Sequence, residues 1–107
     1  MKGRRIPVVD PNADPYTLLT EPGDYYGPSA YASAGNPAVW FLLPIARDEG
    51  VPSEARSLHH VQMPPHVFIE EPDGTLTIRD SIGAGPSGNY YWHGYLTEGR
   101  WELTKSK

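Results

Sequence analysis

The chain has 107 residues, a length typical of a single domain, and a formal net charge of −4 at pH 7. Its 12 prolines and 11 glycines exclude a helical bundle, and its 3 tryptophans and 7 tyrosines exclude a wholly disordered chain. No apolar run approaches the roughly 20 residues that cross a bilayer. The lack of cysteine excludes thiolate chemistry, and the acidic balance argues against general nucleic-acid binding, so we expect neither a membrane nor a nucleic acid among the partners.

The first segment of the chain, residues 1–37, is rich in proline, glycine and tyrosine. Each of its prolines restricts the residue before it to extended geometry, so we expect a looping arm without regular secondary structure. Because such an arm has no core of its own, its large side chains must pack on the rest of the chain or on another protein. Its tyrosines are Tyr16, Tyr25, Tyr26 and Tyr31, and we predict that at least two of them contact a partner.

Residues 38–107 are expected to form the β core of the same domain. Residues 38–43 are a continuous apolar run closed by Pro44, and the content of Val, Trp and Phe favours a strand that is buried on both faces. The next segment is expected to be mostly loop. A short helix is predicted over residues 53–61, because Ser53 is a suitable N-cap.

A β-hairpin is predicted around Glu71-Pro72-Asp73-Gly74, between residues 66–71 and 75–80. Proline at the second turn position and glycine in the left-handed position specify a type I turn with a G1 bulge. The resulting cross-strand pairs are Phe68 with Ile78, Glu70 with Leu76, and His66 with Asp80. Phe68, Leu76 and Ile78 then share the core face of the hairpin.

A second hairpin is expected from residues 90–96 and 100–104, around Thr97-Glu98-Gly99. A three-residue turn places Tyr95 opposite Trp101 and His93 opposite Leu103. Two hairpins and one apolar strand predict a mainly β fold: a small antiparallel sandwich or rolled sheet of about five strands, with the extended arm, in one domain.

Part of this second half of the chain resembles a known family. The Asp73-Gly74 turn leads to Ser81-Ile82, and then to His93-Gly94-Tyr95-Leu96, which is followed by Gly99 and Trp101. This pattern resembles a family of small proteins of unknown function from bacteriophages, prophages and bacterial genomes. No activity is established for that family, so the resemblance implies an origin rather than a mechanism. It implies a phage-encoded protein, located in the cytoplasm of a bacterial host or in the virion.

The histidines are candidates for a metal site, because His is a common metal ligand. A small metal-dependent enzyme that uses His60, His66 and His93 is therefore one alternative. A cluster of His60, His66 and Asp80 is compatible with the register of the first hairpin. The spacing matches no zinc signature, however, and a single cross-strand pair of His66 with Asp80 is the simpler interpretation. We expect no metal, no cofactor and no enzymatic activity.

The aromatic residues carry the functional prediction. Trp40, Tyr95 and Trp101 are assigned to the core, but a domain of this size cannot bury every ring. Tyrosine and tryptophan dominate protein interfaces, because they offer a large area with few rotors. The candidate binding residues are Tyr16, Tyr25, Tyr26, Tyr31, Tyr90 and Trp92. They predict a non-enzymatic protein-interaction module whose partner is a phage structural protein or a host protein. A homo-oligomer is left open, and a glycan-binding module is an alternative because the same rings stack on sugars.

Overall fold

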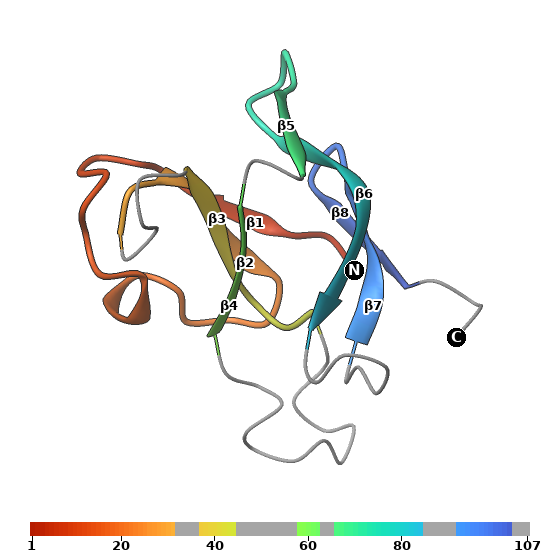
Figure 1. Ribbon diagram of the computed structural model, residues 1–107, viewed down its shortest axis with the longest axis horizontal. Helices are drawn as coiled ribbons and strands as arrows, with labels where there is room; N and C mark the ends of the chain where they lie inside the picture. The colour runs from red at the N-terminus through yellow and green to blue at the C-terminus, as the bar shows by residue number, and fades with distance from the viewer. Residues whose placement is uncertain (32–36, 45–57, 63–65, 85–91, 104–107) are drawn as a thin grey trace.

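The fold is mainly β in the part of the chain that the structure describes (Figure 1). The computed structural model describes residues 1–31, 37–44, 58–62, 66–84 and 92–103. Within these ranges, eight strands form two four-stranded sheets that pack against each other. This confirms the mainly β prediction and is compatible with a small sandwich. The expected number of strands, about five, is too low.

Strand order follows the sequence in both sheets. The first sheet contains β1 (Arg4–Ile6), β2 (Asp24–Ser29), β3 (Ala38–Leu42) and β4 (Leu58–Gln62). The second contains β5 (Val67–Glu70), β6 (Leu76–Ala84), β7 (Trp92–Thr97) and β8 (Arg100–Leu103). β1 runs parallel to β2, and the other neighbouring strands are antiparallel. A short 3-10 helix, η1 (Pro15–Thr17), lies between β1 and β2.

β3 confirms the strand predicted from the apolar run. Val39 and Phe41 belong to the core between the two sheets, whereas Ala38 and Trp40 belong to a second apolar cluster on the outer side of the first sheet. All four residues are buried, as predicted for a strand that is covered on both faces.

The first hairpin has the predicted turn and core register. Gly74 has a φ of +87° and donates its N–H to the Glu71 carbonyl over 3.0 Å, as the G1 bulge requires. Phe68 pairs with Ile78, and Leu76 and Ile78 are both buried. The turn residues alone were sufficient to specify this part of the fold.

The predicted pair of His66 with Asp80 is wrong, because the regular register ends before it. His66 precedes β5, and the pairing of β6 with β7 is irregular between Ile78 and Ile82. Within this irregularity Asp80 adopts a left-handed φ of +69°. His66 instead lies with its Nε2 atom 3.1 Å from the carbonyl oxygen of Ser81.

The second hairpin differs from the prediction by one residue. Glu98 and Gly99 have φ values of +47° and +77°, as in a two-residue type I′ turn, whereas the prediction assumed a three-residue turn. The observed pairs are Gly94 with Leu103, Tyr95 with Glu102, and Leu96 with Trp101, so neither predicted pair forms. A shift of one residue changes which face a side chain occupies. Trp101 is buried as predicted, but Tyr95 is exposed and does not belong to the core.

Part of the segment predicted to be a helix forms a strand. Residues 58–61 lie within β4, where Val61 pairs with Val39 of β3. Residues 53–57 lie outside the described residues. Pairing with β3 outweighs the weak local preference for a helix, because most of the stability of an element comes from tertiary contacts.

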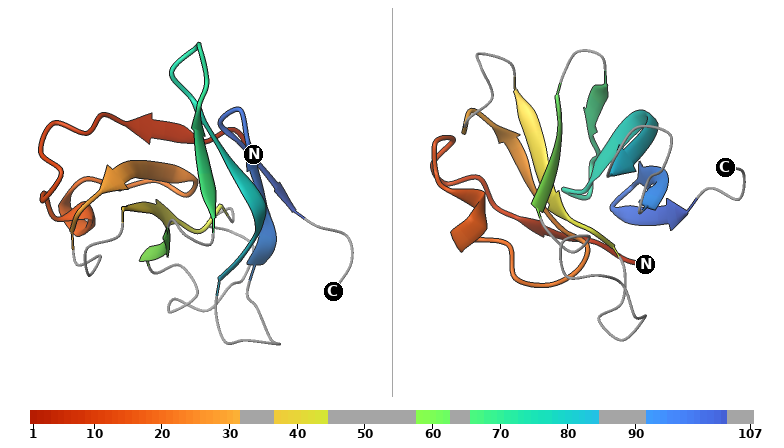
Figure 2. Two further views of the ribbon diagram at one scale, coloured as in Figure 1. Left: turned by 45° about the horizontal axis from the view of Figure 1, so that its top comes forward. Right: turned by 60° about the horizontal axis from the view of Figure 1, so that its bottom comes forward.

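The expected arm is instead part of the fold. The Gly3 N–H donates to the Gly99 carbonyl over 2.7 Å, and Lys2 forms an antiparallel bridge with Arg100, so residues 1–3 lie beside β8. The chain then continues into β1, which pairs with β2. The first six residues therefore cross from the second sheet to the first (Figure 2).

The prolines of this segment do not prevent strand formation, because they lie where no ladder N–H is needed. Pro28 falls in β2 where the register with β3 shifts between Tyr26 and Ser29. Pro15 occupies the start of η1, where a missing N–H is tolerated. The segment thus supplies two strands to the first sheet and not a free arm.

Candidate functional site

Three of the predicted binding residues are buried. Tyr25, Tyr26 and Trp92 are 1%, 0% and 5% exposed, which corrects the expectation that their rings meet a partner. Burial raises the pKa of both tyrosine hydroxyls. The Tyr25 hydroxyl accepts the N–H of Leu76 over 3.3 Å and so connects the two sheets. Tyr90 lies outside the described residues.

The other two predicted residues, Tyr16 and Tyr31, come together around Trp40 on the outer side of the first sheet. The ring centroid of Trp40 lies 6.4 Å from that of Tyr16 and 5.8 Å from that of Tyr31. The imidazole of His60, on the neighbouring strand, stacks on Trp40 with a centroid distance of 4.4 Å. We call these four residues the Trp40 cluster. Tyr16 is 65% exposed, whereas Trp40 is buried.

A capped turn holds Tyr16 at the surface. Asp14 is the N-cap of η1, and its carboxylate accepts the Tyr16 N–H over 2.9 Å. The Thr17 hydroxyl donates to the Asp14 carbonyl over 2.7 Å. The backbone of Tyr16 is therefore held by its own turn while its ring is presented to solvent.

The indole N–H of Trp40 has no hydrogen-bond partner in the described part of the chain, although its Nε1 atom is buried. A buried donor without an acceptor costs about 1–3 kcal/mol. Because Nε1 is covered by its neighbours, this N–H is a cost to the fold and does not act as a donor at the surface. This cluster is not recognisable from the sequence, in which Trp40 has the pattern of a core residue and His60 that of a candidate metal ligand.

A second exposed surface lies on the outer face of the sheet formed by β5–β8. Val67 pairs with Arg79, and Tyr95 pairs with Glu102. Ile78 pairs with Leu96, so Arg79 and Tyr95 are the next residues on β6 and β7, where the irregular stretch begins, and we treat the two pairs as one row. Val67 and Tyr95 are 47% and 43% exposed, and Arg79 and Glu102 are exposed as well. We call the surface around this row the β5–β8 face. It was missed because the predicted turn directed Tyr95 into the core.

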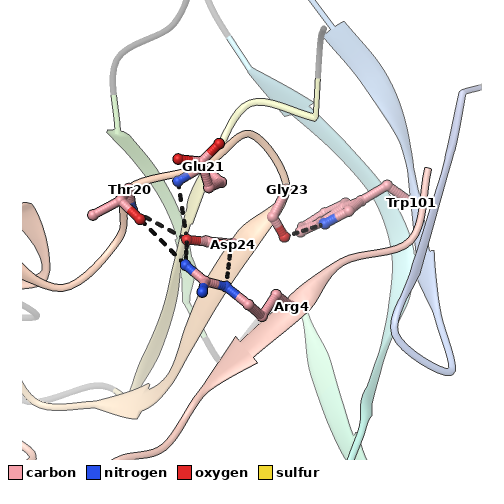
Figure 3. A network of polar contacts seen from close by, with 6 residues as sticks. All are labelled: Arg4, Thr20, Glu21, Gly23, Asp24 and Trp101. Carbon is pink, nitrogen blue, oxygen red and sulfur yellow. Dashed lines mark hydrogen bonds and ion pairs between the residues drawn. The ribbon is translucent and has the colours of Figure 1, made fainter.

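Asp24, on β2, is the centre of a buried polar network (Figure 3). Its carboxylate accepts Arg4 Nε at 3.0 Å and Arg4 Nη2 at 2.7 Å, and the backbone N–H groups of Thr20 and Glu21 at 3.1 Å and 3.0 Å. Burial by itself raises the pKa of Asp24, but these hydrogen bonds outweigh it and hold the pKa below its usual value. The network fastens β1 and the loop before β2 to β2, which is a structural role.

The histidines of the metal alternative lie on separate elements. His60 is in β4, His66 precedes β5, and His93 is in β7. Within the described ranges, no three side chains of the metal-ligating types lie close enough together to hold an ion. The geometry therefore gives the metal-dependent alternative no support.

Comparisons of the chain with family models, with curated proteins and with solved structures found no match. In the part of the chain that the structure describes, no helix is long and apolar enough to span a membrane. The two exposed aromatic surfaces are therefore the basis for the functional proposal.

Proposed function

We propose that this chain is a non-enzymatic protein-interaction module that binds its partner through the Trp40 cluster. The observation that carries the proposal is Tyr16, which is 65% exposed and whose ring lies beside the buried Trp40. Its backbone is held by the capped η1 turn, so little conformational entropy is lost there when a partner binds. Tyrosine in such a position is typical of the residues that contribute most to protein interfaces.

The Trp40 cluster also offers polar recognition. The exposed imidazole of His60, which stacks on the buried Trp40 indole, supplies a polar group on this side of the sheet. The resemblance to phage and prophage proteins supports a partner from the virion or the bacterial host, and a location in the virion or the host cytoplasm.

Quantitative affinity capture from bacterial lysates and from phage particles tests this proposal, followed by titration of the purified partner. The Tyr16→Ser variant is expected to bind that partner at least tenfold more weakly, the loss expected for a residue that dominates an interface. Val9→Ser is the matched control, because Val9 is 92% exposed and lies on the same segment. It should bind as the wild type does.

Two results would contradict the proposal. One is equal binding of the partner by wild type and Tyr16→Ser. The other is binding to a glycan array with no protein captured, which would support the glycan-binding alternative, since an exposed tyrosine ring also stacks on sugars.

A further inference from the structure

The β5–β8 face has opposite charges on the two sides of an exposed tyrosine. Tyr95 of β7 lies in the middle of its row, with Arg79 on the β6 side and Glu102 on the β8 side. Neighbouring strands are about 4.8 Å apart, so within one chain β7 separates the backbones of Arg79 and Glu102 by roughly 10 Å. Among the described residues, neither charged side chain makes a hydrogen bond or an ion pair.

A two-fold axis that runs parallel to the strands and passes through Tyr95 would bring these charges together. Such an axis places two copies face to face and carries the β6 side of one copy onto the β8 side of the other. Arg79 of each copy then meets Glu102 of the other, and the two Tyr95 rings meet at the axis. One symmetric arrangement thus pairs Arg79 and Glu102 of each copy with the opposite charge of the other, and it covers the exposed Tyr95 ring.

The adjacent row of the β5–β8 face fits the same arrangement. It lies two residues along the strands and contains Ile69, Thr77, Thr97, Arg100 and Lys2. The axis places Arg100 of one copy against Thr77 of the other, and Lys2 of one copy against Ile69 of the other. The two Thr97 residues face each other across the axis. No like charges are brought together in this row, so the second row does not oppose the contact.

We propose that the chain forms a homodimer through the β5–β8 face, with a second copy of the chain as its occupant. Charge complementarity favours a second copy, because the row carries one cation and one anion on the two strands that flank Tyr95. Four strands about 4.8 Å apart present a narrow face. We expect a contact limited to this face to belong to the smaller interfaces, and the dimer to depend on concentration.

Sedimentation velocity of the full chain, from micromolar to millimolar concentration, tests the proposal. The wild type is expected to shift from monomer to dimer over this range. Arg79→Glu and Glu102→Arg should each weaken dimerisation about tenfold, because each sets like charges against each other at two symmetric positions. The double variant Arg79→Glu/Glu102→Arg should dimerise as the wild type does. The single changes shift the net charge in opposite directions, so a net-charge effect cannot weaken both.

Two tyrosine variants form a matched pair. Tyr95→Ser is expected to weaken the dimer, and Tyr16→Ser to leave it unchanged, because Tyr16 lies on the outer side of the other sheet. Circular dichroism checks that each variant is folded. A wild type that stays monomeric, a double variant that does not recover, or equal weakening by both tyrosine variants would overturn the proposal. Since Tyr16→Ser is the variant that removes partner binding, the two proposals fail independently.

Discussion

Replacing Asp24 by alanine measures what the buried carboxylate contributes to stability. Asp24 is 1% exposed and accepts hydrogen bonds from Arg4 and from the backbone N–H groups of Thr20 and Glu21. The alanine variant leaves both backbone donors without their acceptor, at about 1–3 kcal/mol each. Thr20 and Glu21 are themselves exposed, so water replaces part of the loss. We expect the free energy of unfolding to fall by about 2–3 kcal/mol.

Two further variants separate the backbone donors from the ion pair. Arg4→Ala should reduce the stability less than Asp24→Ala, because the Arg4 side chain is 59% exposed and its loss leaves Asp24 with both backbone donors. Asp24→Asn should also reduce it less, since one amide oxygen can replace the Oδ2 atom that accepts both backbone N–H groups.

Urea unfolding followed by tryptophan fluorescence is a suitable assay, because Trp40, Trp92 and Trp101 are all buried in the folded chain. Trp101 also donates its Nε1–H to the Gly23 carbonyl over 2.8 Å, next to the network. Equal losses in Asp24→Ala and Arg4→Ala would refute the reasoning. They would mean that the ion pair, and not the backbone hydrogen bonds, carries the stabilisation.

Three other outcomes follow from the structure. The pKa of Asp24 is lower in the folded than in the unfolded chain. The ionised carboxylate therefore stabilises the fold fully above the usual carboxyl pKa, about 4, and this stabilisation is lost as the pH falls through the folded pKa. In urea unfolding, the stability advantage of the wild type over Asp24→Asn should shrink only below about pH 4. Ile78→Ala should reduce the free energy of unfolding by about 2–5 kcal/mol, whereas Val67→Ala, at a half-exposed position on the opposite face, should change it by less than about 1 kcal/mol. Deleting residues 1–6 should lower the urea midpoint strongly, because it removes β1 and the pairing with β8; an unchanged midpoint would contradict the role of this crossing segment.

The two hairpins show what the sequence could and could not predict. The first turn contains Pro72 and Gly74 at positions that fit one turn type, and the register followed from it. The second contains only Gly99 as a conformational signal, which fits a two-residue or a three-residue turn. The choice depends on whether Glu98 adopts a positive φ. The observed two-residue turn buries Leu96 completely in the core and leaves Tyr95 exposed, and this tertiary packing is not visible in the turn residues.

The first segment could not be predicted because its pairing is non-local. Its proline spacing correctly excludes a long helix, but strand formation there depends on partners far away in the sequence: β1 pairs with β2, and Lys2 with Arg100. Local propensity contains no information on such contacts. For the same reason Tyr25 and Tyr26 were assigned to a surface, although they alternate between the two apolar clusters of the first sheet. Tyr16 and Tyr31 lie outside the strands, and their contact with a partner stays a prediction.

The positions of the two surfaces determine how the two proposals combine. The Trp40 cluster is on the outer side of the first sheet, and the β5–β8 face is on the outer side of the second, with the core between them. A dimer through the β5–β8 face would therefore leave both copies of the Trp40 cluster accessible. Two linked sites bind a partner with repeated copies, such as a particle surface, more tightly than one site does, without any new contact. Arg79→Glu should then weaken binding to a multivalent partner and leave binding to a monomeric partner unchanged, and surface plasmon resonance with the partner at high and low density would distinguish the two.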